Sequence, residues 1–452
     1  MGRIELLEPF LTGGIRNTNF FNGRLLSAED LRQEQQANRA RDAQLAGAIG
    51  AGVVHGLQVE RAPQTEGGGL TNAVVLVRAG LALNDNGQSL SLPSDTEVAL
   101  MREFDPVNAE AGLFATCAPP RQTAVVAGAG VYLLVITPAS GYEQRAPASG
   151  LGNAGLTSPG CGSRYAVEGV QFKLVNVNIN TLAGITATTR TQLNTQMSKG
   201  TAQSLSLLRN LLAHLFLASD EVDAFIADPF KADFSMQPNS KYGLLDTLRT
   251  QGDLTACDVP LALIYWTAGG VRFVDMWSAR RRPTRRAVFD RWSPILDDRH
   301  ASEGEATFQQ FQNQIEQLLA SETSPQRIRA KDYFRYLPPV GIIPITLTSS
   351  SDGFDSLTFF NDLTHHDAVF TDGAKVARLL RTACDYPPVD LHNPVDVEST
   401  EMFWLYNVRQ NTQAQAAGAT SVKSYLIFSS GQMPFAGESR FDVSRWSYSN
   451  YI

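Results

Sequence analysis

The residues of this sequence that are best suited to binding charged groups form a run of arginines. Guanidinium groups pair with carboxylates or phosphates through parallel hydrogen bonds, and they stack on aromatic rings such as those of Trp277 and Trp292. Two roles are open: the run contacts acidic surfaces of neighbouring subunits, or it pairs within the chain with Asp290, Asp297 and Asp298. The run consists of Arg280, Arg281, Arg282, Arg285 and Arg286.

The net charge of the chain argues against nucleic acid as the partner of these arginines. The 45 acidic residues outnumber the 38 basic ones, whereas affinity for nucleic acid depends on an excess of lysine and arginine. Charged residues make up 18% of the chain and hydrophobic residues 43%, so a core is easily built and few charges oppose association. Because 452 residues exceed a typical single domain, we expect several packed units that cover surface with neighbouring subunits.

Two motifs could bind a cofactor or a metal, but their surroundings do not suit either. Residues 150–155 match the GxGxxG dinucleotide fingerprint, which requires a strand that leads directly into a helix; Pro159 and Gly160 follow instead. His365, His366 and Asp367, with Asp362 nearby, offer metal ligands. Adjacent side chains diverge on a strand or a helix, so both histidines are poorly placed for one ion. We predict no cofactor and no metal.

Catalytic signatures are missing from the sequence. There is no GxSxG nucleophile elbow, Walker loop, HExxH zinc motif or paired-carboxylate signature. His214 stands alone in a leucine-rich helical segment, where a histidine of the core or of an interface is expected. We therefore predict that the chain is not an enzyme, and a hydrolase without a local motif remains an alternative.

The cysteines and the first residues bear on the compartment. Four cysteines at long spacings form neither a metal clip nor a dense disulfide framework, so we expect reduced, mostly buried thiols. Glu5 and Glu8 interrupt what would be the apolar part of a signal peptide, and no run of 18 apolar residues occurs. These features predict a cytoplasmic protein without a transmembrane segment.

Residues 28–49 are predicted to form a helix that is polar on nearly all sides. Ser27 and Asp30 have the spacing of an N-terminal capping box. The thin apolar stripe of this helix consists of Leu31, Ala37 and Leu45. A helix this polar is typical of one that packs against partners. The interface residues that we expect on it are Gln33, Gln35, Gln36 and Arg39.

Strand patterns recur along the rest of the chain and are broken by helical segments. The turn Asn84–Gly87 is expected to join two strands within 73–92. A strand at 131–137 precedes a Gly-, Ser- and Pro-rich segment, 139–163, that predicts a long surface loop. Leucine spacing predicts a core helix over 200–227. Further expected elements are a strand at 167–177, a hairpin over 259–277, helices at 304–321 and 373–383, and strands at 402–409 and 423–429.

Together these segments predict an α+β, β-rich fold. We expect several β-sandwich or barrel-like units of mostly antiparallel strands, with interspersed helices. Three domains are predicted: an N-terminal helix plus a small β domain over 1–125, a central β-rich domain over 126–300, and a C-terminal α+β domain over 301–452.

Several segments also resemble a known family in their order along the chain. They are FFNGRLLSAEDLRQEQ (20–35), GVVHGLQVE (52–60), VRAGLALNDNGQSLSL (77–92), RYAVEGVQFKLV (164–175), CDVPLALIYWTAGGVRFVDMWSARRRP (257–283), YFRYLPPVGIIPI (333–345) and YLIFSSGQMPF (425–435). These segments resemble parts of proteins encoded with phage-tail-like contractile injection systems. The resemblance implies a structural, baseplate-associated subunit in several symmetric copies, with baseplate, tube or sheath proteins as partners and no catalytic residues. Such a particle assembles in the cytoplasm and is then released or attached to a membrane.

A second reading is a module that binds a glycan or a surface receptor. The C-terminal segment 440–452 is rich in aromatic residues, which suit stacking on sugar rings. The same aromatics also suit docking of this segment on its own domain or on a neighbouring subunit, so Trp446 and Tyr448 are further interface candidates.

Overall fold

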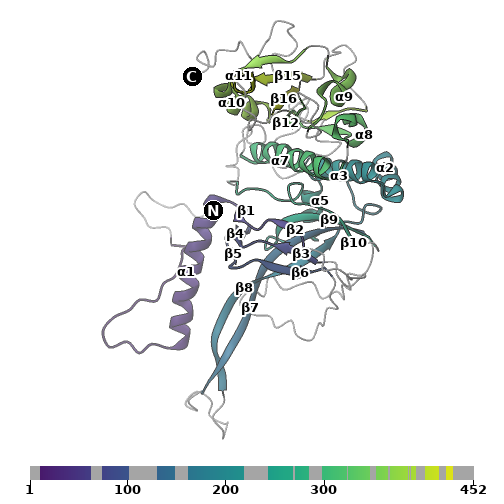
Figure 1. Ribbon diagram of the computed structural model, residues 1–452. Coiled ribbons are helices and arrows are strands. Elements are labelled where there is room, and N and C mark those ends of the chain that lie inside the picture. The colour runs from purple at the N-terminus through teal and green to yellow at the C-terminus, as the bar shows by residue number, and fades with distance from the viewer. Residues whose placement is uncertain are drawn as a thin grey trace.

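The computed structural model describes residues 11–62, 74–100, 130–147, 161–217, 243–267, 270–284, 298–322, 324–346, 353–364, 367–384, 386, 388–392, 403–416 and 424–430. Over these ranges the predicted α+β class is confirmed: most strand pairs are antiparallel, several small sheets form, and none of them closes into a barrel. Figure 1 shows a C-terminal unit, a layer of helices beneath it, and the remaining sheets below. The helical layer contains α2 (Ala187–Lys199), α3 (Ala202–Leu217) and α7 (Asp298–Ser321), and α1 (Ala28–Ile49) stands to one side.

Two small antiparallel sheets follow α1 in the chain. Their orders are β1-β4-β5 and β2-β3-β6, with β1 (Gly52–Gly56), β2 (Val59–Arg61), β3 (Val74–Val77), β4 (Gly80–Leu83), β5 (Ser89–Leu92) and β6 (Thr96–Ala99). The predicted tight turn joins β4 to β5. Gly87 there adopts a φ of +74°, and the Asn84 side chain accepts hydrogen bonds from the backbone N–H groups of Asn86 and Gln88.

The central sheet has the order β10-β9-β7-β8 with antiparallel pairs throughout. Its strands are β7 (Gly130–Pro147), β8 (Cys161–Asn176), β9 (Val259–Thr267) and β10 (Gly270–Asp275). β7 and β8 remain paired as far as Pro147 opposite Cys161, so the loop predicted over 139–163 is wrong at both of its ends. Antiparallel backbone hydrogen bonds depend weakly on side chains, so a Gly- and Ser-rich composition does not prevent pairing. Residues 148–160, with the glycine motif, lie outside the described residues.

The layer of helices is built around α3. The predicted leucine-rich core helix is confirmed over 202–217, two residues after the predicted start at 200, and its predicted end, 218–227, lies outside the described residues. Leu208, Leu212 and Phe216 are fully buried in the core that α3 shares with the central sheet and with α5 (Gly243–Gln251). α7 begins at Asp298, six residues before the predicted start at 304. The sequence analysis missed α2, whose Thr- and Gln-rich sequence has no broad apolar stripe.

The C-terminal unit is a four-stranded sheet of order β12-β16-β15-β13 packed against helices. Its strands are β12 (Val340–Pro344), β13 (Val369–Thr371), β15 (Phe403–Val408) and β16 (Tyr425–Ser430), and a small pair, β11 (Tyr336–Leu337) and β14 (Val389–Asp390), lies beside it. Its helices are α8 (Ala330–Tyr333), α9 (Ser356–Phe360), α10 (Gly373–Ala383), α11 (Arg409–Ala416) and the 3-10 turns Pro325–Arg327 and Asn361–Leu363. The helix predicted over 373–383 is confirmed as α10.

Hydrophobic cores connect these layers. The small sheets share one core with a face of the central sheet, through Val53, Val75 and Leu90 on one side and Leu134 and Ile264 on the other. The opposite face of the central sheet packs on the helices, and the C-terminal unit has a separate core rich in phenylalanine. The domain boundaries near residues 125 and 300 stay predictions.

The cysteines differ from the sequence expectation in one respect. Cys257 is disulfide-bonded, so the prediction of reduced thiols is wrong for this residue, whereas Cys384 is a thiol. Spacing along a chain does not reveal which cysteines meet in space, and this limited the prediction. Among the described helices, none has an apolar stretch long enough to cross a membrane.

Candidate protein interface

The helix α1 begins as its sequence predicts. The Ser27 side chain accepts a hydrogen bond from the Asp30 backbone N–H at 3.2 Å, and the Asp30 carboxylate accepts one from the Ser27 backbone N–H at 3.0 Å. That second hydrogen bond is the main cause that lowers the pKa of Asp30. Arg24 also contacts the Asp30 carboxylate, so the chain that enters the helix is fixed to its first turn.

The rest of the described chain contacts α1 at several points along its length. Ala37 is the buried residue of the helix, and Thr18 donates its backbone N–H to Glu34 at 3.3 Å. Arg39 Nη2 lies 2.7 Å from Glu168 Oε1 on β8. Gly87 in the β4–β5 turn packs so closely that an added Cβ would lie 2.3 Å from the Ala43 carbonyl oxygen.

The predicted interface residues of α1 lie on its exposed surface. Gln33, Gln35, Gln36 and Arg39 are all solvent-exposed. Gln33 and Gln36 line an open groove of about 530 Å³ between the helix and the preceding segment, which contributes Ile15 and Arg16. Amides and guanidinium groups along such a groove can form hydrogen bonds with another chain.

A larger signal, which the sequence patterns did not predict, lies beside these polar residues. Many exposed large apolar side chains gather between residues 11 and 54, where Leu25 is 94% exposed. They are Leu11, Phe20, Phe21, Leu25, Leu26, Leu31, Leu45, Ile49 and Val54. We call residues 11–49 the N-terminal arm. A concentration of exposed apolar groups marks a surface that contacts another protein or a membrane. The signal in the sequence was the phenylalanine and leucine content of FFNGRLL directly before a polar helix.

A second projecting element lies next to the arm. Figure 1 shows the paired strands β7 and β8 extending away from the central sheet on the same side of the molecule as α1. This β7–β8 ribbon exposes Tyr142, Tyr165 and Val167. The Arg39–Glu168 ion pair joins it to α1, so the two projections form one continuous surface.

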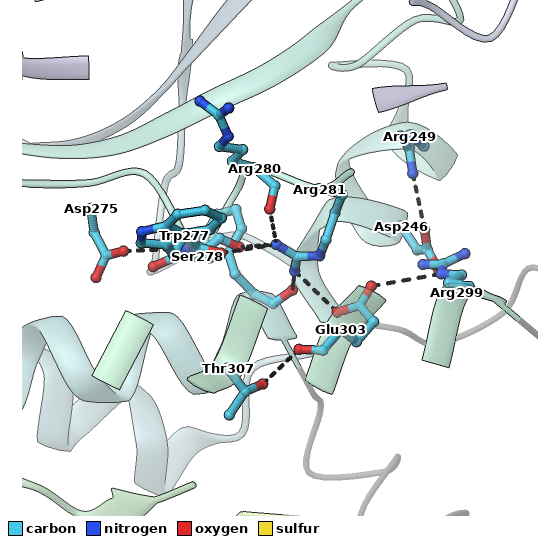
Figure 2. Close-up of polar contacts among 11 residues, drawn as sticks. Asp246, Arg249, Asp275, Trp277, Ser278, Arg280, Arg281, Arg299, Glu303 and Thr307 are labelled. Atoms are coloured by element: carbon cyan, nitrogen blue, oxygen red, sulfur yellow. Dashed lines mark hydrogen bonds and ion pairs between the residues drawn. The ribbon is translucent and has the colours of Figure 1, made fainter. Parts of the chain in front are cut away.

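The structure separates the roles of the arginine run. Figure 2 shows Arg281 pointing toward α7, where its Nη2 lies 3.0 Å from Glu303 Oε2 and its Nη1 donates to the carbonyl oxygens of Trp277 and Ser278. Arg282 Nε lies 2.9 Å from Glu305 Oε2 at the surface. The predicted pairing within the chain therefore occurs for these two arginines, but with glutamates of α7 that the sequence did not single out.

Arg280 differs from its neighbours. Its guanidinium carbon lies 5.6 Å from the centre of the Trp277 ring, and Figure 2 shows it pointing away from Glu303. Its Nη1 is buried without a hydrogen-bond partner. Burial lowers the pKa of Arg280 to about 10. Of the three arginines that the structure describes in this run, Arg281 and Arg282 pair with glutamates, whereas Arg280 lies over the Trp277 ring. Its role at an interface stays a prediction.

The remaining candidates lie outside the described residues. They are Arg285, Arg286, His365, His366, Trp446 and Tyr448. Within the described ranges, no group of three or more His, Cys, Asp or Glu side chains is arranged to hold a metal ion.

Comparison with known proteins adds no relative. No protein-family model matches the sequence, and no curated protein is significantly similar to it.

Arg281 and Arg282 provide a matched test of this local structure. Replacing Arg281 with Gln is expected to lower the free energy of unfolding by about 3 kcal/mol, because a largely buried Glu303 and four carbonyl oxygens each lose a hydrogen-bond donor. Replacing Arg282 with Gln is expected to cost less than about 1 kcal/mol, since its ion pair is exposed. Urea denaturation followed by circular dichroism measures both values, and equal losses would contradict the assignment.

Proposed function

We propose that this chain is a structural subunit of a phage-tail-like contractile injection system, at or beside the baseplate. The observation that supports an assembly role is the concentration of exposed apolar side chains on two projecting elements, the N-terminal arm and the β7–β8 ribbon. The resemblance of seven ordered sequence segments to proteins of these systems supports the choice of machine.

The energetics favour a partner for the arm. Fully burying a leucine or phenylalanine side chain stabilises by about 1.5–3 kcal/mol, and association of two proteins costs about 4–15 kcal/mol in lost freedom. Phe20, Phe21, Leu25 and Leu26 are each more than half exposed. Their burial alone offsets the lower part of that cost, and the apolar residues of α1 add to it.

The proposal includes partners of two kinds. Other subunits of the particle, from the baseplate, the tube or the sheath, contact the projecting elements, and further copies of this chain complete a symmetric arrangement. No catalytic step, cofactor or nucleic acid is part of the proposal, and the particle assembles in the cytoplasm.

Deleting the gene from the organism that encodes it is expected to give particles with incomplete baseplates in electron micrographs. Complementation with the native chain should restore them. A chain with Phe20→Asp and Leu25→Asp should not, because charged groups replace the apolar contacts of the arm.

A matched control separates loss of the interface from loss of folding. Leu357 is 78% exposed on α9, far along the chain from the arm, so complementation by Leu357→Asp should succeed. Complete baseplates in the deletion strain would contradict the proposal. Saturable binding of the purified chain to a glycan array would favour the receptor-binding alternative.

A further inference from the structure

The helix α1 has one face that the described chain leaves uncovered. Its own contacts run through Glu34, Ala37, Arg39 and Ala43, whereas Leu31, Asn38 and Leu45 follow one another at seven-residue spacing on another face. Seven residues of a straight helix return to within about 20° of the same direction, so these three side chains form one line. Leu31 is 53% exposed and Leu45 68% exposed.

This face is symmetric about Asn38. The helix spans residues 28–49, so Asn38 lies at its middle, with a leucine about 10 Å away along the axis in each direction. On one flank of the line lie Glu34 and Arg41, and on the other lie Gln35 and Asp42. Each flank therefore has two groups of complementary chemistry, one before the midpoint of the helix and one after it.

We propose that α1 pairs antiparallel with α1 of a second copy of this chain, about a two-fold axis at Asn38. In this arrangement Leu31 packs on the partner's Leu45, and Glu34 meets the partner's Arg41. Gln35 can donate a hydrogen bond to the partner's Asp42. The two Asn38 side chains meet at the axis, where a polar residue in an apolar seam fixes register and orientation.

Charge distinguishes this orientation from a parallel one. The first half of α1 has three carboxylates, those of Glu29, Asp30 and Glu34, against one arginine, whereas Arg39 and Arg41 outnumber Asp42 in the second half. Antiparallel pairing brings opposite charges together and opposes the two helix dipoles. Parallel pairing would instead place the two acidic halves side by side and align the two helix dipoles, which is unfavourable.

This inference rests on the proposed role of the chain as an assembly subunit, because it names one of the partners. Sedimentation of the purified full-length chain is expected to show a dimer. The double substitution Leu31→Glu and Leu45→Glu should raise the dissociation constant about 100-fold or more, since it places charges in the seam. Both side chains are exposed in the single chain, so circular dichroism should show unchanged folding. Leu357→Glu, at a comparably exposed leucine, should dimerise as the native chain does.

Charge exchange tests the orientation. Glu34→Arg alone and Arg41→Glu alone should each weaken the dimer about tenfold, because each creates like-charged pairs across the axis. The double variant Glu34→Arg with Arg41→Glu should recover most of the loss. A parallel pair contains no contact between Glu34 and Arg41, so the double variant would not recover what the single variants lose.

Three results would overturn the inference. The first is a chain that stays monomeric at a concentration about 100-fold above a micromolar dissociation constant. The others are a dimer whose dissociation constant does not change in the double leucine variant, and single charge variants that dimerise as the native chain does. Results that contradict the proposed function differ from results that contradict the pairing of α1. A dimeric chain whose deletion leaves complete baseplates would remove the injection-system role but keep the pairing, and a monomeric chain that is required for baseplates would do the reverse.

Discussion

Replacing Arg209 with Met is expected to lower the free energy of unfolding by about 3–5 kcal/mol, which is the usual cost of removing one partner of a buried ion pair. Arg209 lies on α3, and its Nε is 2.6 Å from Asp275 Oδ2 at the end of β10. The side chain of Asp275 is completely buried. Without Arg209, the Asp275 carboxylate remains in the interior as an uncompensated charge.

The surrounding network explains why this pair matters to the whole fold. Asp275 also accepts hydrogen bonds from the Gln310 side chain of α7 at 2.9 Å and from the Ser278 backbone N–H at 3.1 Å. Arg209 donates to Asn313 and Gln317, which both lie on α7. One buried ion pair therefore connects the central sheet, α3 and α7, the helix on which the C-terminal unit packs. Its loss should loosen the contact between the layers.

The pH dependence follows from the sign of the pKa change. Burial raises the pKa of Asp275, but the charge of Arg209 and three hydrogen bonds outweigh it, so the folded-state pKa lies below the ordinary value of 3.8. A lowered folded pKa stabilises the fold above the unfolded pKa, and this contribution disappears as the pH falls through the folded pKa. In Arg209→Met the carboxylate loses that stabilisation, so the stability deficit should be smaller at pH 4 than at pH 7.

Urea denaturation at the two pH values measures the deficit. Arg282→Met is the matched control, since Arg282 forms an exposed ion pair with Glu305 on the same helix α7. Its expected cost is below about 1 kcal/mol at either pH. A deficit for Arg209→Met that equals this control, or that grows at low pH, would contradict the assigned role.

Local signals account for what the sequence predicted correctly. The capping box at Ser27 and Asp30, the turn Asn84–Gly87 and the helix over 373–383 each depend on residues within a few positions of one another. Interactions between residues this close in the chain can be predicted from the local sequence. The same holds for the exposed polar residues of α1, because helix propensity and polarity suffice to predict an exposed helix.

Pairings between distant residues account for what the sequence did not show. Arg209 and Asp275 are separated by 66 positions, and Arg281 and Glu303 by 22. Nothing in the local pattern says which arginine meets which carboxylate. The β7–β8 ribbon likewise continues through Gly141 and Gly162 because the opposite strand is there to pair with, although glycine predicts a loop. In the arm, the thin apolar stripe divides: Ala37 packs inward, whereas Leu31 and Leu45 face away from the chain.

Replacing Phe428 with Ala is expected to destabilise the C-terminal unit by about 3–5 kcal/mol, because it removes a fully buried ring from the centre of a phenylalanine cluster. Phe428 lies on β16, and its ring centre is 5.3–5.4 Å from those of Phe311, Phe360 and Phe403. Phe370→Ala is the control, since Phe370 is 43% exposed and should cost less than about 1 kcal/mol. Equal losses in urea denaturation would contradict this prediction.

The glycine opposite this ring shows how closely the site is packed. An added Cβ at Gly341 on β12 would lie 2.5 Å from the Phe428 ring and 2.6 Å from the Phe311 ring. Gly341→Ala should therefore destabilise the native chain by about 1–3 kcal/mol through overpacking. In the Phe428→Ala background only the Phe311 ring still opposes the added methyl group, so the cost of Gly341→Ala should shrink. A double-mutant cycle measures this coupling, and additive effects would show that the ring and the glycine do not share one packed site.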